Sequence, residues 1–415
     1  MKKKCILAGI QLAGINNFDE QFNECISLVE ACDYEISATL VQARRSAHPA
    51  TLFGSGKIDE IKELAQEHKV STLILNCEIT PSQMKALKEI IGLRVIDRTD
   101  LILEIFASRA KSKEAKLQVE LATLKHSIPY VIRTGQDFSR MGGGNSAKNK
   151  GEGEKQLELD RRKIESQIHR VAAHLETVQN NRQTMRRKRK KGIMPLVALI
   201  GYTNAGKSTC MNAILKLNEV ENDKEVFVKD MLFATLDTTI RSVVWKGHSF
   251  LLSDTVGFVS NLPHDLIKAF HSTLEEVVEA DIILHVLDES NELRDAQRSV
   301  SEETLKTLNA DGKPTLYLHN KCDLGEFKTN HDQHLYMSAS KHIGIEDVLD
   351  KIVEMCFADY SAIKVLIPYL ANNIIKLIEN EAIIDQCIHD ELGFIYDLRV
   401  HNSLLPQLRG FILNT

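Results

Sequence analysis

The stretch GYTNAGKST, from Gly201 to Thr209, restricts the fold more than any other part of the sequence. It has the spacing G-x-x-x-x-G-K-[ST], and it lies between an apolar run, LVALI, and a helix-like run, TCMNAILKL. A buried strand, a glycine loop and a helix in this order surround a phosphate group with backbone N–H groups. We therefore expect a parallel α/β domain with a phosphate-binding loop made of Gly201, Tyr202, Thr203, Asn204, Ala205, Gly206, Lys207, Ser208 and Thr209.

Three further motifs follow this loop in the order typical of a GTP site. DTVG supplies Asp254 for Mg²⁺, held through water, and the Gly257 N–H for the γ-phosphate. NKCD supplies Asp323, which can accept two hydrogen bonds from guanine but not from adenine. The remaining predicted contacts are Lys207 on the β- and γ-phosphate oxygens, the Ser208 hydroxyl on Mg²⁺, Asn320 and Lys321 at the base, and Ser338 and Ala339 of MSAS at the guanine O6.

Hydrolysis requires more than these contacts. Many small GTPases place a glutamine after the D-x-x-G glycine to orient water, but Phe258 occupies that place here. We therefore expect slow intrinsic hydrolysis that a partner or a moving element accelerates. In FATLDTTIR, Thr239 is the predicted second Mg²⁺ ligand, with Thr235 and Thr238 as alternates, so Lys207, Thr239 and Gly257 are the predicted catalytic residues.

The composition describes an ordinary soluble chain. Of its 415 residues, 43% are hydrophobic and 26% are charged, and the net charge of -5 confines nucleic-acid affinity to local patches. The eight cysteines form no C-x-x-C pair, which favours reduced thiols over disulfides or zinc. The N-terminal run MKKKCILAGIQL is briefly signal-like, but it is short, and no segment approaches a membrane span. We expect a cytoplasmic monomer.

The chain divides into four predicted parts. Residues 1–98 alternate strand-like and helix-like runs, which indicates a small α/β domain. Residues 99–192 predict an antiparallel helical hairpin with a tip at 134–153, since apolar residues recur at intervals of three, four and seven. The two seams consist of Leu117, Leu121, Leu124 and Ile128, and of Leu157, Ile164, Ile168, Val171, Leu175 and Val178. Residues 193–359 predict the P-loop GTPase domain, and residues 360–415 a small α+β domain.

Two segments of the hairpin region carry basic residues in an arrangement that suggests phosphate. MGGGNSAKNKGEGE joins two helices instead of following a strand, so its glycines and lysines favour contact with RNA phosphate over nucleotide binding. RRKRKK, from Arg186 to Lys191, has the same reading, although solvated hairpin turns and linkers explain many such runs. The predicted RNA contacts are Asn145, Lys148, Asn149, Lys150, Arg186, Arg187, Lys188 and Arg189.

Several long stretches resemble the HflX family of translational GTPases, within the Obg-HflX superfamily. The resemblance covers nearly the whole chain and is weakest at the C-terminal segment. It is specific, because generic GTPases lack the hairpin segment and the LPHDL stretch. The stretches that carry it are LFGSGKIDEI, VIDRTDLILEIFASRAKSKEAKLQVELATL, GEGEKQLELDRR, FATLDTTIR and SDTVGFVSNLPHDLIKAFHSTLEEVVEADIILHVLDES.

The resemblance implies a factor that binds the large ribosomal subunit and its rRNA. It implies that GTP hydrolysis is stimulated by the ribosome, that stalled or stressed ribosomes are split or rescued, and that the hairpin reaches the peptidyl-transferase region. Related GTPases often place a ligand for potassium at the position of Asn204, although a loop-stabilising amide explains this residue equally well.

Two departures from the family pattern affect these expectations. The family usually has Pro-Thr where this chain has Thr238-Thr239. Its hairpin tip usually reads as a glycine run followed by G-T-R-G-P-G-E, whereas this chain reads GGGNSAKNKGEGE, with Asn145, Lys148, Asn149 and Lys150 in the changed part. The altered tip suggests the hypothesis of relief from ribosome-targeting antibiotics. Two other functions stay open: an RNA chaperone whose GTPase only regulates affinity, and a stress-regulatory GTPase with a non-ribosomal partner.

Overall fold

The computed structural model describes residues 2–14, 17–140, 158–178, 194–218, 239–255, 257–259, 276–325 and 329–413, with side chains left out for 131–140. These residues fall into two compact units. Among the described residues, the first unit comprises 2–14, 17–140, 158–178 and 257–259, and the second comprises 194–218, 239–255, 276–325 and 329–413. Each unit is described by itself.

The first unit contains a four-stranded parallel sheet with the order β2-β1-β3-β4. Its strands are β1 (Lys3–Leu12), β2 (Tyr34–Arg44), β3 (Thr72–Leu75) and β4 (Arg94–Ile96). Successive side chains of a strand point to opposite faces, so Cys5 and Leu7 of β1 join one core cluster while Ile6 and Ala8 join the other. The signal-like N-terminal run is therefore a buried interior strand of the predicted α/β domain.

Four helices cover this sheet: α1 (Phe18–Ala31), α2 (Ser55–Glu67), α3 (Pro81–Ile91) and α4 (Arg98–Arg109). Their starts follow local sequence signals. Thr80 and Gln83 form a capping box at α3, and the Asp97 side chain accepts a hydrogen bond from the Asp100 N–H at α4. α3 ends at Gly92, whose φ of 74° is the left-handed conformation that glycine adopts without strain.

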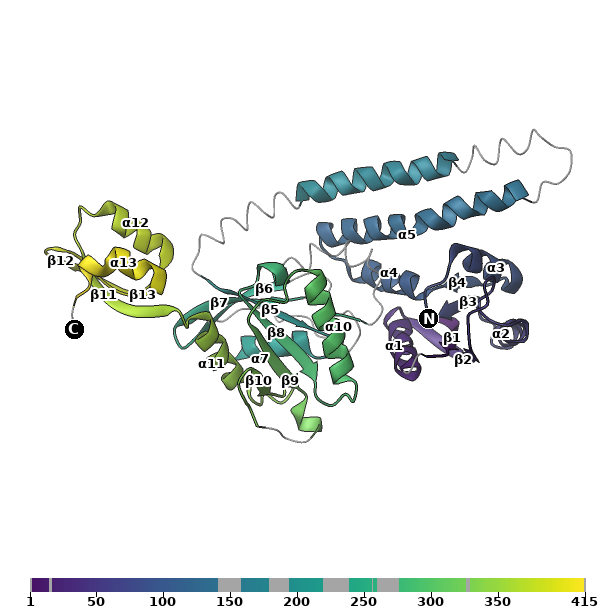
Figure 1. Ribbon diagram of the computed structural model, residues 1–415, viewed down its shortest axis with the longest axis horizontal. Helices are drawn as coiled ribbons and strands as arrows, with labels where there is room; N and C mark the ends of the chain where they lie inside the picture. The colour runs from purple at the N-terminus through teal and green to yellow at the C-terminus, as the bar shows by residue number, and fades with distance from the viewer. Residues whose placement is uncertain are drawn as a thin grey trace. The chain divides into compact units, whose positions relative to one another are not determined.

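A helical hairpin follows, as the apolar spacing predicts. α5 (Lys113–Arg140) has 28 residues, a length of about 42 Å, and the helix of residues 158–178 lies beside it in Figure 1. Six of the predicted seam residues pack together across the two helices: Leu117, Leu121, Leu124, Ile168, Val171 and Leu175. Ile128, Ile164 and Val178 do not belong to this cluster, and Leu157 lies outside the described residues. The predicted tip was wrong at its first residue, because α5 continues to Arg140 instead of ending before 134. Helical backbone hydrogen bonds need no apolar partner, so a helix can outlast its buried seam.

The second unit contains a six-stranded sheet with the order β10-β9-β8-β5-β7-β6. Its strands are β5 (Leu196–Gly201), β6 (Thr239–Trp245), β7 (His248–Asp254), β8 (Ile282–Asp288), β9 (Thr315–Asn320) and β10 (His334–Tyr336). Only β6 is antiparallel to its neighbour among these pairs. The named helices are α7 (Lys207–Lys216), α10 (Arg294–Thr307) and α11 (Ile345–Cys356), with a short 3-10 turn, η1 (Cys322–Leu324). This is the predicted P-loop GTPase fold.

The same unit ends in a small antiparallel sheet with the order β11-β13-β12, which is the predicted α+β segment. Its elements are β11 (Tyr360–Ile367), α12 (Asn372–Glu381), β12 (Ala382–Asp390), β13 (Gly393–His401), η2 (Asn402–Leu404), α13 (Leu405–Leu408) and η3 (Arg409–Phe411). Arg399 of β13 donates a hydrogen bond to the Gly247 carbonyl at the β6–β7 turn, at 2.8 Å. The small sheet is therefore held to the larger one by a direct polar contact.

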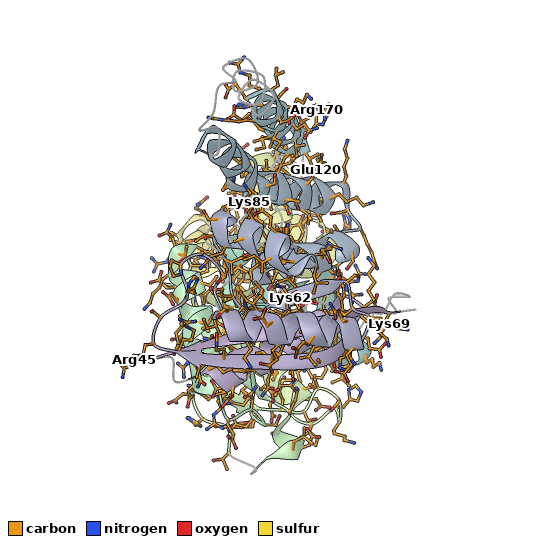
Figure 2. All side chains as sticks on the ribbon, turned by 90° about the vertical axis from the view of Figure 1, so that its right-hand side faces the viewer. Arg45, Lys62, Lys69, Lys85, Glu120 and Arg170 are labelled. Atoms are coloured by element: carbon orange, nitrogen blue, oxygen red, sulfur yellow. The ribbon has the colours of Figure 1, made fainter. Side chains whose placement is uncertain are left out.

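Two global expectations can be compared with the described residues. All eight cysteines are free thiols, as their spacing indicates. In the part of the chain that the structure describes, no helix combines the length and the apolar character that crossing a membrane requires. Figure 2 shows charged side chains projecting from the helices of the first unit, where Lys62, Lys85, Glu120 and Arg170 mark α2, α3, α5 and the helix of residues 158–178.

Candidate nucleotide site

The phosphate-loop motif connects the carboxyl end of β5 to the N-terminus of α7. Gly206 is the N-cap of α7 and has a φ of 94°, and the Cys210 N–H donates to its carbonyl at 2.8 Å. The first N–H groups of a helix have no partner within the helix, so this loop presents donors to an anion. Tyr202, Thr203 and Ala205 are buried around the loop, whereas Asn204 is exposed and left-handed, with a φ of 63°.

Two glycines of this loop have no room for a side chain. At Gly201, which has a φ of 145°, an added Cβ would collide with the Val286 carbonyl oxygen. At Gly206, an added Cβ would collide with the Asn320 side-chain amide nitrogen. The backbone therefore approaches β8 closely at Gly201 and the NKCD loop closely at Gly206, which explains why the motif requires glycine at both positions.

Lys207 points back into the loop that it follows. Its Nζ donates to the carbonyl oxygens of Gly201 at 3.0 Å and Tyr202 at 2.8 Å. The side chain is 7% exposed, and burial lowers the pKa of its ammonium to about 8, although the nearby Asp254 opposes this shift. The lysine is thus held where phosphate oxygens can replace carbonyl oxygens as its partners.

The three predicted metal ligands converge beside the loop. The Ser208 hydroxyl donates to Asp254 Oδ2 at 2.6 Å, and Asp254 is fully buried at the end of β7. Thr239 begins β6 directly opposite Asp254 in the antiparallel ladder. Hydroxyl and carboxylate oxygens are the hard ligands that Mg²⁺ prefers, so this group of residues fits the Mg²⁺ dependence that is typical of a GTPase domain.

Asn320 connects the base-binding motifs to the phosphate loop. Its Nδ2 donates to the Ala205 carbonyl at 2.8 Å, and its Oδ1 accepts from the Ala339 N–H at 3.0 Å. Ser338 is fully buried beside Ala339, whereas Asp323 is exposed in η1, where its carboxylate is accessible. Three loops far apart in the sequence are therefore joined by one buried amide.

Sequence reasoning missed two residues that support these loops. Asp288 Oδ2 pairs with Lys321 Nζ at 2.7 Å, and the Thr255 hydroxyl donates to the Leu199 carbonyl at 2.6 Å. Asp288 ends β8 at the same sheet edge as the phosphate loop, and this position was the available signal. Thr255 offered no comparable signal, because its bond depends on the parallel pairing of β5 and β7.

Several predicted residues are not placed in this site. Thr235, Thr238 and all eight predicted RNA contacts lie outside the described residues: Asn145, Lys148, Asn149, Lys150, Arg186, Arg187, Lys188 and Arg189. Gly257 is described, but it belongs to the first unit, so its contact with the γ-phosphate stays a prediction.

The fold and this site define a P-loop GTPase, an enzyme that binds guanine nucleotides and hydrolyses GTP. Three family models match the chain: "GTP-binding GTPase N-terminal" at residues 19–107, "GTP-binding GTPase Middle Region" at 109–189 and "50S ribosome-binding GTPase" at 196–321.

Curated relatives identify the family. The GTPase HflX of Caldanaerobacter subterraneus is 37% identical and matches 95% of this chain and 91% of its own. Those of Alkalihalophilus pseudofirmus and Escherichia coli are 43% and 36% identical, matching 77% and 81% of this chain and 74% and 79% of their own. A GDP complex of a GTP-binding protein from Sulfolobus solfataricus is 24% identical, with a TM-score of 0.45, over 86% of this chain and 99% of that one. The chain belongs to the HflX family of GTPases.

Proposed function

We propose that this GTPase is a translation factor that binds the large ribosomal subunit and splits or rescues stalled ribosomes. The observation that carries the proposal is the seam-packed hairpin, which a GTP-hydrolysing domain does not itself need. The match to a family described as 50S ribosome-binding supports the choice of partner.

The distribution of charge along the hairpin supports a distinction between a helix with balanced charges and basic segments that bind RNA. In the helix of residues 158–178, the basic side chains Arg161, Arg162, Lys163 and Arg170 are balanced by Glu158, Asp160, Glu165 and Glu176. Three of these basic residues form ion pairs within the helix, as in the contact of Arg161 with Glu165 at 2.8 Å. Binding to rRNA phosphate therefore depends on the lysine-bearing tip and on the RRKRKK run.

Each predicted residue has a specific role in binding the nucleotide. The phosphate loop from Gly201 to Thr209 holds the phosphates, and Lys207 neutralises their oxygens. Ser208, Thr239 and, indirectly, Asp254 would hold Mg²⁺. Asp323 and Asn320 select guanine, with the Lys321 stem over the ring and Ala339 at O6. Bound Mg²⁺ would supply charge neutralisation at the phosphates.

Switching follows from the same residues. GTP orders Thr239 and Gly257 around the γ-phosphate, and this order sets how the first unit docks on the ribosome. Because Phe258 replaces the water-orienting glutamine, docking on the ribosome supplies the missing acceleration. A potassium ion beside Asn204 is a further candidate for that acceleration.

The test compares GTP hydrolysis with and without purified large ribosomal subunits. It uses the intact chain and a variant in which residues 141–154 are replaced by a plain glycine-serine turn. Stimulation of the intact chain alone links the tip to docking on rRNA, and stimulation of both supports ribosome binding with a separate task for the tip. If neither responds, the ribosomal proposal fails, and a non-ribosomal partner becomes the better reading.

A Lys207→Ala variant serves as the control. It should lose hydrolysis in every condition, because its phosphate loop lacks the ammonium group. If it still remodels RNA as well as the intact chain does, the RNA-chaperone function is favoured instead.

A further inference from the structure

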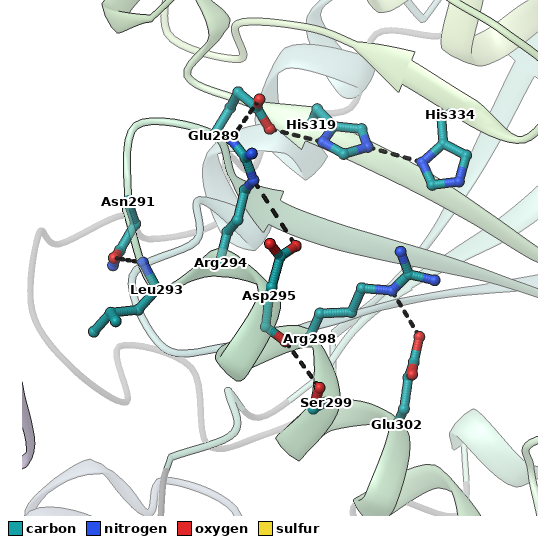
Figure 3. A network of polar contacts seen from close by, with 10 residues as sticks. All are labelled: Glu289, Asn291, Leu293, Arg294, Asp295, Arg298, Ser299, Glu302, His319 and His334. Atoms are coloured by element: carbon teal, nitrogen blue, oxygen red, sulfur yellow. Dashed lines mark hydrogen bonds and ion pairs between the residues drawn. The ribbon is translucent and has the colours of Figure 1, made fainter. Parts of the chain in front are cut away.

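Behind the NKCD loop, four polar side chains form a continuous chain that none of the predicted nucleotide contacts includes (Figure 3). Arg294 of α10 donates to Glu289 Oε1 at 2.7 Å, and Glu289 Oε2 contacts His319 Nδ1 at 2.8 Å. His319 Nε2 in turn contacts His334 Nδ1 at 2.9 Å. The chain therefore crosses from α10 to β9 and then to β10.

Aromatic rings pack against the two histidines of this hydrogen-bonded series. The side chains of Glu289 and His319 are 3% and 10% exposed. The His319 ring stacks on Tyr336 with centroids 4.4 Å apart. The His334 ring stacks on Tyr317 at 4.8 Å. Such packing fixes the orientation of both imidazoles, and the burial of Glu289 and His319 keeps water from replacing the hydrogen bond between them at little cost.

Backbone hydrogen bonds connect this chain to the base-binding loop. His319 directly precedes Asn320, whose amide joins the phosphate loop to Ala339. The Glu289 N–H donates to the Asn320 carbonyl at 2.9 Å, and the Met337 N–H donates to the His319 carbonyl at 2.9 Å. A displacement of the His319 side chain is therefore transmitted to the residue that aligns all three loops.

The number of protons on the two imidazoles determines whether the hydrogen bond between His319 and His334 can form. Because the Glu289 carboxylate accepts, His319 Nδ1 carries hydrogen, and in neutral His319 the Nε2 atom accepts from His334 Nδ1–H. With one added proton, His319 donates from both nitrogens and His334 Nδ1 accepts, so the contact survives. With two added protons, both facing nitrogens carry hydrogen, and the 2.9 Å contact between His319 and His334 cannot form.

Among the residues that the structure describes, charged and titratable groups lie near the pair on each neighbouring element. They are His285 and Asp288 of β8, Arg294, Arg298 and Glu302 of α10, Lys321 after β9, and His331 and Asp332 before β10. Burial lowers the pKa of His334, and His319, Arg298 and His331 lower it further. The two imidazoles together therefore take up a second proton only at acidic pH.

We propose that Glu289, His319 and His334 position the guanine-binding loop, and that uptake of a second proton by the two imidazoles weakens guanine recognition. This inference rests on the proposed assignment of Asn320 and Asp323 to the base. The class of ligand is a guanine nucleotide, and the proton acts on the base site and not on the phosphates.

The test measures the dissociation constants of fluorescently labelled GDP and ADP, with Mg²⁺, at pH 7.5 and 5.5. The ratio of the two constants isolates the base, because protonation of the phosphates affects both nucleotides. In the unaltered chain, the preference for GDP should fall between pH 7.5 and 5.5, by up to about fivefold to tenfold, the effect of losing one buried hydrogen bond when both imidazoles are protonated. In a His334→Phe variant, which keeps the ring on Tyr317, the preference should be the same at both pH values within about twofold.

Two more variants complete the experiment. His331→Phe is the matched control, since His331 stacks on His334 but takes no part in the side-chain hydrogen bonds of this series. Because His331 lowers the pKa of His334, this variant should show at least the full fall. Glu289→Gln keeps an acceptor for His319 but removes the negative charge that favours protonation of the imidazoles. The loss of preference for GDP in this variant should therefore occur below pH 5.5. This variant decides the question if His334→Phe fails to fold.

Three results would overturn the inference. It is wrong if the unaltered chain shows no fall at pH 5.5, if His334→Phe retains the fall, or if Glu289→Gln leaves its pH range unchanged. An unaltered chain that binds GDP and ADP equally at pH 7.5 would refute the base assignment itself, which separates that failure from failure of the proton-linked chain.

Discussion

Replacing His285 with leucine should remove part of the acid sensitivity of the second unit. His285 lies inside β8 and is 0% exposed, and neither ring nitrogen has a hydrogen-bond partner among the described residues. Burial lowers the pKa of its imidazole to about 3; the nearby Glu302 opposes this shift and Arg298 adds to it. The folded protein therefore holds this ring neutral over the whole physiological range.

The size of the effect follows from this pKa. In the unfolded chain the imidazole titrates near 6.5, so the stability that the neutral ring contributes is complete above that pH and declines as pH falls toward 3. One pKa unit corresponds to about 1.4 kcal/mol, so the folded state loses about 2 kcal/mol between pH 7.5 and 5.0. The full loss near pH 3 is on the order of 5 kcal/mol. Leucine does not titrate and avoids this loss.

The variant should also be stable at neutral pH. A buried ring nitrogen without a partner costs about 1–3 kcal/mol, and a leucine of similar volume relieves that cost. We therefore expect His285→Leu to be at least as stable as the unaltered chain at pH 7.5 and clearly more stable at pH 5.0.

Trp245 makes this difference measurable. It is the chain's single tryptophan, it lies in β6 of the same unit, and its Nε1 donates to Asp350 Oδ1 at 2.7 Å. Its fluorescence during guanidinium titrations at both pH values gives the free energy of unfolding. The control is His389→Gln, an exposed histidine of β12, which should leave the pH dependence unchanged.

The decisive quantity is the change in unfolding free energy between the two pH values, compared between variant and unaltered chain. An equal loss in both would refute the reasoning, because it would mean that His285 takes up its proton in the folded state as easily as in the unfolded one. A large destabilisation at pH 7.5 would show that the ring has a partner that leucine cannot replace.

Three further results are expected. Gly206→Ala should weaken GDP binding at least about 100-fold, measured by nucleotide titration, since its Cβ would displace Asn320, while Gly247→Ala, also left-handed but open around its Cβ, should bind normally. GDP affinity should fall about threefold between pH 7.5 and 8.5 as Lys207 loses its proton in the free protein, and an unchanged affinity would contradict the assignment. Leu121→Ala should speed amide hydrogen exchange in the hairpin, because it removes a seam contact. Hairpin exchange rates equal to those of the unaltered chain would contradict this expectation.

The sequence was sufficient wherever function depends on local backbone geometry. A glycine turn after an apolar strand can be recognised without knowing its neighbours, so the position of the phosphate loop between β5 and α7 was predictable. The hairpin seam was equally readable, because apolar spacing follows directly from helical geometry. The N-terminal strand was missed because a short apolar run after lysines also suits a signal segment, and only its pairing with β2 and β3 distinguishes the two.

The tertiary structure alone decided which distant residues share an environment. His285 and His319 both look like isolated polar residues in apolar strands, yet one is buried without a partner and the other belongs to a hydrogen-bonded chain. Strand order and register place Glu289, His319 and His334 together, and these depend on packing over the whole sheet. Local spacing thus determined the chemistry of this protein as a GTPase, whereas the three-dimensional fold determined which side chains can tune it, since burial and hydrogen bonding act through space and not along the chain.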